Sequence, residues 1–147
     1  MITAMDGRPQ AAIQTLNSVV EQSGDPYMAI YLAETHEEQG VAALSRGADA
    51  LAMKEFEAAL RLEPNRPVSL GNLGYLKYRA RDYKEARALL ERAYALFPAS
   101  AAITLRLAMV CDAQGDTARG EELYEKVVRD RPDLRAKLKR TAPPHKS

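Results

Sequence analysis

The sequence predicts an all-α protein built from a stack of antiparallel helix pairs, and three observations support that prediction. Pro64, Pro98 and Pro132 stand 34 residues apart, twice over. Between these prolines, small and large side chains recur at fixed places. The composition is rich in Leu, Ala, Glu, Arg and Lys, which is typical of helical proteins. A repeat of this period indicates that each copy is one supersecondary unit stacked on its neighbours.

The recurring places are clear when the chain is divided into blocks that begin at Ala33, Pro67 and Ala101. Small residues at two places of each block allow two helices to approach closely, and a large residue fills the space between them. We therefore expect Ala86 to be buried between paired helices, with Gly74 facing it. In block order, the eighth place holds Gly40, Gly74 and Ala108, and the twentieth holds Ala52, Ala86 and Gly120. The twenty-fourth place holds Phe56, Leu90 and Tyr124, and the twenty-seventh holds Ala59, Ala93 and Val127.

These blocks resemble the tetratricopeptide repeat family, which has the same 34-residue period and helix–turn–helix unit. The resemblance covers residues 33–132 in three full copies and implies a right-handed α-solenoid. It also implies a concave groove lined by the first helix of each repeat. The predicted organisation is a partial repeat or N-terminal capping helix at 1–24, three repeats within 25–132 (33–66, 67–100 and 101–132, the first helix extended back to 26), a C-terminal capping helix at 133–140 and a disordered tail at 141–147.

The N-terminal segment matches the second half of a repeat, with Gly7 in the turn and Ala12, Leu16 and Val19 at repeat positions. Met1–Met5 would then end a first helix that is missing, and a simple capping helix is the alternative. Asp25 and Pro26 suit the N-cap and the first position of a helix that runs to about residue 46. That helix is longer than the family's first helices. We expect the apolar residues at its start to pack on the preceding helix: Tyr27, Met28, Ile30, Tyr31 and Leu32.

The remaining helices follow from capping residues and turn signals. Asp82 and Glu85 have the spacing of a capping box, and Ser100 precedes another apolar run. Because all links are short, neighbouring helices should be antiparallel. The predicted helices span 49–62, 67–80, 83–96, 101–113 and 117–130.

The formal net charge is +1, but the charge is unevenly placed. Residues 1–63 hold 4 Lys/Arg and 10 Asp/Glu, a balance of −6, whereas residues 64–147 hold 17 and 10, a balance of +7. Such asymmetry indicates a polar partner at one end. The sequence has one cysteine, Cys111, and no apolar run of the roughly 18 residues that a spanning helix requires. The cytoplasm is the expected compartment, and the periplasm is the alternative if a signal was removed.

Catalytic, cofactor and metal sites are not expected. His36 stands among Glu34, Glu37 and Glu38 without a second histidine or cysteine nearby, so we interpret it as part of a solvated polar face. Cys111 is interpreted as a small buried hydrophobe. RNA binding is kept as a lesser alternative, because the basic residues of the second half are interleaved with acidic ones.

The resemblance implies which residues line the groove, which is acidic at one end and apolar and aromatic in the middle. A protein–protein interaction module or assembly scaffold is therefore predicted, and a regulatory or targeting portion of a larger enzyme or of a secretion or pilus-type machine is the alternative. Asn72 and Arg106 match two of five places of the lysine-rich clamp with which some family members bind a C-terminal carboxylate. The predicted partner-binding residues are Glu34, Glu37, Val41, Leu44, Val68, Tyr75, Tyr78, Arg79, Leu105, Arg106 and Met109.

Opposite charges at the two ends of the chain suggest a further hypothesis. Glu34 and Glu37 are three residues apart on one helix face, and Glu38 is beside them. Residues 135–147 carry five Lys/Arg and no acid. These acidic residues could receive a basic segment with apolar anchors, either from a partner or from the tail of a second copy. The alternative is two solvated ends that never meet.

Overall fold

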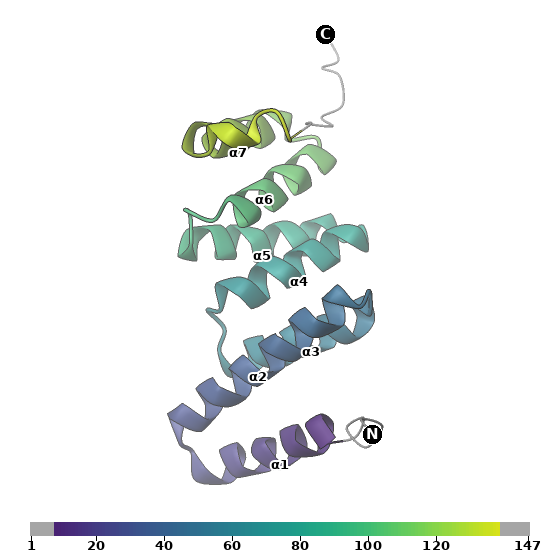
Figure 1. Cartoon of the computed structure of the whole chain (residues 1–147), viewed down its shortest axis with the longest axis vertical. Helices are drawn as coiled ribbons and strands as arrows, with labels where there is room; N and C mark the ends of the chain where they lie inside the picture. The colour runs from purple at the N-terminus through teal and green to yellow at the C-terminus, as the bar shows by residue number, and fades with distance from the viewer. Residues whose placement is uncertain (1–7, 139–147) are drawn as a thin grey trace. The chain divides into compact units, whose positions relative to one another are not determined.

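The computed structural model describes residues 8–138, with side chains from residue 11 onward. Within this range the chain forms α-helices, one short 3-10 helix and no strand (Figure 1). Each predicted helix between residues 26 and 130 begins and ends within about one residue of its expected position, and the all-α prediction is confirmed. The elements are α1 (Arg8–Ser23), α2 (Pro26–Ser45), α3 (Asp49–Leu62), α4 (Pro67–Arg79), α5 (Tyr83–Leu96), α6 (Ala101–Ala113), α7 (Thr117–Asp130) and η2 (Pro132–Leu134).

The chain divides into two compact units, Met1–Ser69 and Leu70–Ser147, and the boundary falls inside α4. In the first unit, α2 packs along α3 and also contacts α1. In the second unit, α6 packs against α5 and α7. Each unit is therefore a set of neighbouring helices that cover one another's apolar faces, as stacked helix pairs do.

The core of the first unit depends on the close approach of α2 to α3. A methyl group added to Gly40 would lie 2.7 Å from Cε1 of Phe56, a distance that real side chains do not tolerate. Phe56 is fully buried, as are Ala52 and Ala59 on the same helix. The predicted pairing of a small residue on the first helix with a large residue on the second is confirmed here.

The second unit repeats this contact with different residues. A methyl group at Gly74 would lie 2.6 Å from Cγ of Leu90 and 3.3 Å from the backbone oxygen of Ala86. Ala86 is fully buried, as the sequence predicts. The surrounding core contains Ala86, Leu90, Leu107, Ala108, Val110, Cys111 and Leu123, with Tyr78, Tyr83 and Tyr94 packed against its edge.

Helix caps and turns also repeat every 34 residues. Asp82 accepts a hydrogen bond from the backbone nitrogen of Glu85 at 3.3 Å, and Asp116, 34 residues later, accepts from that of Arg119 at 3.4 Å. Ser100 caps α6 as the sequence predicts. The turns within the three helix pairs have a left-handed residue at equivalent places, Gly47 (φ 75°), Arg81 (φ 63°) and Gly115 (φ 82°). Two of the three are glycine, the residue that adopts this conformation without steric cost.

Two segments differ from the expectation. The start of α2 was expected to pack on the preceding helix, but Tyr27, Ile30 and Tyr31 are 79%, 42% and 58% exposed, and only Leu32 of that group is buried. After α7, Pro132–Leu134 forms a 3-10 helix, and turns continue to residue 137. The rest of the predicted capping helix and the predicted tail lie outside the described residues.

Candidate partner-binding site

Helices α4 and α6 lie next to each other in the second unit. A methyl group at Gly71 would lie 3.2 Å from Cγ1 of Ile103 and 3.7 Å from Nη1 of Arg106. Gly71 is buried by this contact, so it cannot face a partner as a groove residue would. Its small size instead allows the two first helices of consecutive repeats to approach, which makes one surface of α4 and α6.

Tyr75 is at the centre of that surface and carries a guanidinium group over its ring from each of two helices. The carbon of the Arg106 guanidinium lies 4.9 Å from the ring centroid, and that of Arg79 lies 5.7 Å away. Nη1 of Arg106 also donates to Oδ1 of Asn72 at 3.0 Å. Cation–π stacking and this hydrogen bond hold the Arg106 side chain in one orientation.

Arg106 is half-buried without a compensating negative charge. Among residues 8–138, no carboxylate forms an ion pair with it. Burial lowers the pKa of Arg106 from its ordinary value, and the opposing influence of Tyr75 is smaller. A guanidinium always remains charged in a protein. It therefore presents donors that an acceptor from outside the unit can satisfy.

The other predicted residues of the second unit differ in accessibility. Met109 is 41% exposed and Arg79 is exposed, whereas Leu105 is half-buried. Tyr78 stacks on Tyr75 at a centroid distance of 6.4 Å, meets the ring of Tyr83 in a tilted arrangement at 5.7 Å, and packs against the core. Tyr78 is thus a supporting residue that fixes Tyr75. We define the second-unit surface as Tyr75, Arg79, Arg106 and Met109.

The first unit contains the remaining predicted groove residues. Val41 and Val68 are 44% and 49% exposed, Glu34 is exposed, and Leu44 is half-buried. These side chains are available to a partner on the first unit. We describe them separately from the second-unit surface, because the two sets belong to different compact units.

Glu37 is the predicted groove residue whose bonds are satisfied within its own unit. Its Oε1 accepts from Nη2 of Arg66 at 2.9 Å, and its Oε2 accepts from Nε of Arg66 at 3.1 Å. The same Oε2 accepts from the backbone nitrogen and from Oγ of Ser69, so Glu37 also caps the first turn of α4. Burial acts to raise the pKa of Glu37, but the hydrogen bonds from Arg66 and Ser69 and the charge of Arg66 outweigh it. The pKa of Glu37 is therefore lower than usual.

The solvated-face interpretation of His36 is wrong. His36 is 6% exposed, and its Nδ1 lies 2.7 Å from Oε2 of Glu55 on α3. This pair lines a pocket of about 570 Å³ among α1, α2 and α3. The partner is 19 residues away on a different helix, so local polarity around His36 gave no sign of it.

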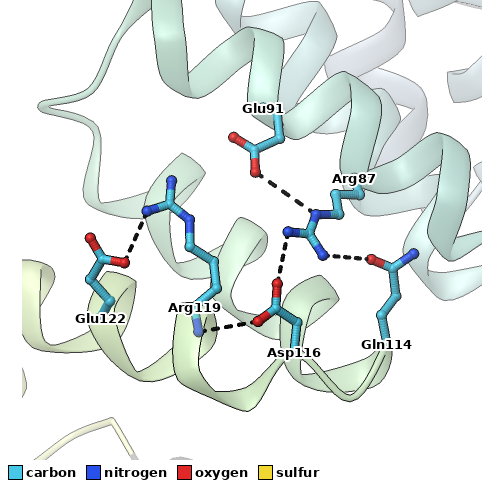
Figure 2. A network of polar contacts seen from close by, with 6 residues as sticks. All are labelled: Arg87, Glu91, Gln114, Asp116, Arg119 and Glu122. Atoms are coloured by element: carbon cyan, nitrogen blue, oxygen red, sulfur yellow. Dashed lines mark hydrogen bonds and ion pairs between the residues drawn. The ribbon is translucent and has the colours of Figure 1, made fainter.

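A polar network in the second unit was also not predicted (Figure 2). Arg87 on α5 donates to Gln114 at 3.1 Å and to Asp116 at 2.9 Å, and Asp116 caps α7 by accepting from the backbone nitrogen of Arg119. Arg119 also donates to Glu122 at 3.2 Å. The network joins α5 to the turn between α6 and α7, and its charges already have partners. We therefore interpret it as a structural contact between consecutive repeats.

Other chemistry has little support in the described residues. Cys111 is fully buried, and burial raises the pKa of its thiol, which opposes the reactive thiolate form. Between residues 8 and 138, no three His, Cys, Asp or Glu side chains gather as metal ligands would. In the same range, no helix has the length and apolar content that crossing a membrane requires.

Comparison with known proteins finds a family model that matches part of the chain. Residues 77–141 match a family model described as a tetratricopeptide repeat. No curated protein matches the chain.

Solved structures with the same fold come from proteins of different kinds. The first tetratricopeptide repeat domain of Spaghetti (RPAP3), bound to an HSP90 peptide, is 20% identical with a TM-score of 0.64, and 69% of this chain aligns with 80% of that one. MamA from Desulfovibrio magneticus RS-1 is 26% identical with a TM-score of 0.64, and 86% of this chain aligns with 68% of it. A mutant O-GlcNAc transferase from Thermobaculum terrenum is 27% identical with a TM-score of 0.65. The alignment covers 69% of this chain and 19% of the transferase.

Proposed function

We propose that this chain is a tetratricopeptide repeat protein and that it acts as a non-enzymatic interaction module that binds a segment of a partner protein. The observation that supports this most directly is Arg106, a half-buried cation stacked on Tyr75 and unmatched by any carboxylate of the described residues. A partner's backbone carbonyl or carboxylate would accept from its free donors. An apolar side chain of the same partner would contact Tyr75 and Met109. We place the module in the cytoplasm, with the periplasm as the alternative.

The orientation of Arg106 is what makes this surface suited to recognition. An arginine that is already fixed by stacking and by Asn72 loses little side-chain entropy when a ligand binds. Hydrogen bonds to a charged group contribute about 1.5–3 kcal/mol each. The surrounding apolar contacts add affinity that exposed charges alone do not provide.

The experiment has two stages. Partners are first captured with the intact chain and identified by mass spectrometry, and the bound segment is then synthesised as a peptide. Calorimetry would compare the wild type with Arg106→Ala and Tyr75→Ala. We expect each substitution to raise Kd about tenfold or more, since 1.4 kcal/mol corresponds to a factor of ten.

The matched control is Arg129→Ala, which removes an exposed arginine on α7 outside the second-unit surface. It should leave Kd within about twofold, because its side chain contacts neither Tyr75 nor Arg106. Circular dichroism would verify that each variant is folded. Unchanged affinity in both Arg106→Ala and Tyr75→Ala would show that the partner binds elsewhere.

An acidic peptide of the chaperone C-terminal kind is a second informative probe. Such a peptide should bind this chain weakly. In the second unit, Asn72 and Arg106 match clamp places, whereas Ala102 stands where the family has a lysine, so one cation of the clamp is missing there. A Kd of about 1 μM or tighter that is abolished by Arg106→Ala would contradict this expectation.

Membership in a larger enzyme is the second candidate role. Its support is the 27% identity to an O-GlcNAc transferase of which the chain spans 19%. In that role the repeats would position a substrate or partner for a catalytic domain. Sequencing the parent gene would decide between the two roles, and a salt-dependent nucleic-acid binding assay would test the lesser alternative of RNA recognition.

A further inference from the structure

The exposed face of α2 is both aromatic and acidic. We define the α2 stripe as six residues that follow one another at spacings of one, three and four and therefore share a helix face. The opposite face of the same helix is buried and includes Leu32, His36 and Gly40. The members of the α2 stripe, all exposed, are Tyr27, Ile30, Tyr31, Glu34, Glu38 and Val41.

The length of α2 creates this surface. The helix has 20 residues, whereas α4 and α6, which occupy the same place in later repeats, have 13 each. The additional turns carry Tyr27, Ile30 and Tyr31, and α1 does not cover them. Exposed apolar residues that gather on one face, unlike isolated ones, indicate an interaction surface.

The acidic members of the stripe form no close ion pair within the described residues. Glu37 between them is bonded to Arg66 and Ser69, and the charge of the same Arg66 acts on Glu34 only from a greater distance. The stripe therefore carries two carboxylates without a close ion pair from residues 8–138, beside two exposed tyrosine rings. This combination favours a segment that carries Lys or Arg, since cations bind both carboxylates and aromatic faces.

The chain itself contains a segment of that chemistry. Residues 137–146 read KLKRTAPPHK, with four Lys/Arg and no acid. Pro143 and Pro144 stand between the cations, and proline-rich segments dock on exposed aromatic rings without a large loss of entropy. We propose that the α2 stripe of one copy binds residues 137–146 of a second copy.

In the expected contact, each chemical group of residues 137–146 meets a complementary group of the α2 stripe. Lys and Arg side chains would bind Glu34 and Glu38, and the two prolines would cover Tyr27 and Tyr31. Exposed ion pairs contribute only about 0–1 kcal/mol each, so the aromatic contacts are needed for affinity. The association joins different surfaces of the two copies and can continue beyond a dimer. It uses neither Tyr75 nor Arg106 and does not depend on the function proposed above.

Sedimentation velocity over a range of protein concentrations would test the proposal. At about 50 mM salt the mean mass of the wild type should rise with concentration, and at about 500 mM salt self-association should weaken about tenfold or more. A wild-type chain that stays monomeric at low salt at every concentration would overturn the proposal.

A charge exchange makes the test specific. One variant carries Glu34→Lys with Glu38→Lys, and the other carries Lys139→Glu, Arg140→Glu and Lys146→Glu. Each variant alone should stay monomeric, because its stripe and its tail then have the same sign of charge. Their mixture should associate again, since opposite charges meet between the two variants. Association of either variant alone, or no association in the mixture, would show that these surfaces do not bind each other.

The matched control changes the net charge equally at two other exposed positions. Glu21 and Glu121 are outside the stripe, so the variant Glu21→Lys with Glu121→Lys should retain self-association. Tyr27→Ser with Tyr31→Ser retains every charge but should weaken association about tenfold, because it removes the aromatic contacts. If this tyrosine variant associates as fully as the wild type, the contact depends on charge alone and the proposed docking of the prolines is wrong.

Discussion

The carboxylate of Glu37 accepts hydrogen bonds from both the backbone nitrogen and the hydroxyl group of Ser69, at 3.1 and 2.6 Å. Arg66 completes the arrangement by donating to both carboxylate oxygens. One side chain of α2 therefore satisfies the first turn of α4 and neutralises the arginine of the intervening link. This relationship makes Glu37 a residue of the fold, and it has a measurable pH dependence.

Glu37→Gln should lower the unfolding free energy by about 1–3 kcal/mol at pH 7, because a charged acceptor with several donors is weakened. The pKa of Glu37 is below its ordinary value of 4.5, so the unfolded state binds the proton more readily. Its contribution to stability is therefore complete above about pH 4.5 and is lost as the pH falls further, through the lowered folded-state pKa. The difference between wild type and variant should shrink accordingly in urea titrations.

The neighbouring Glu38→Gln is the control for this measurement. Glu38 is exposed and makes no ion pair with a described residue, so its substitution should change stability by less than about 0.5 kcal/mol at pH 7. Equal effects of the two substitutions would mean that the bonds to Arg66 and Ser69 contribute nothing to folding.

Ala86→Leu should destabilise the second unit by about 1–3 kcal/mol, because Ala86 is fully buried against α4 beside Gly74. Ala88→Leu provides the same substitution at an exposed position of the same helix and should have little effect. Thermal unfolding followed by circular dichroism would compare them. Equal melting temperatures for the two variants would contradict the helix pairing described here.

Arg81→Gly should stabilise the chain by about 0.5–1 kcal/mol. Arg81 has a φ of 63°, where a side chain is strained, and Gly47 and Gly115 occupy the equivalent turns. The gain is reduced by the greater entropy that glycine has in the unfolded chain. Gly115→Ala is the reverse change and should destabilise, so opposite shifts in melting temperature are the expected result.

Gly120→Ala should destabilise the contact between α6 and α7, because the added methyl group would collide with the carboxylate of Asp112. Asp112→Ala in the same chain should recover part of the loss by making room. A double-mutant cycle on unfolding free energies measures this coupling. Strictly additive effects would show that Asp112 is not the obstacle.

Sequence reasoning predicted the helices and the contacts of this fold because both depend on periodic signals. Gly40, Gly74 and Ala86 recur at fixed places, so their close packing follows from the repeat. His36 and Glu37 were less predictable, because their partners are 19 to 32 residues away and have no periodic pattern. The exposure of Tyr27 was also missed, since an apolar residue at the start of a helix gives no sign of whether a neighbour covers it.

The burial of Cys111 has a practical consequence for experiments on this protein. It is the only cysteine in the sequence, it is fully buried in the second unit, and burial raises the pKa of its thiol. Its rate of reaction with a thiol reagent therefore reports how often the second unit opens, without any labelled variant. A new cysteine at an exposed position could likewise carry a single fluorophore while the native thiol stays protected.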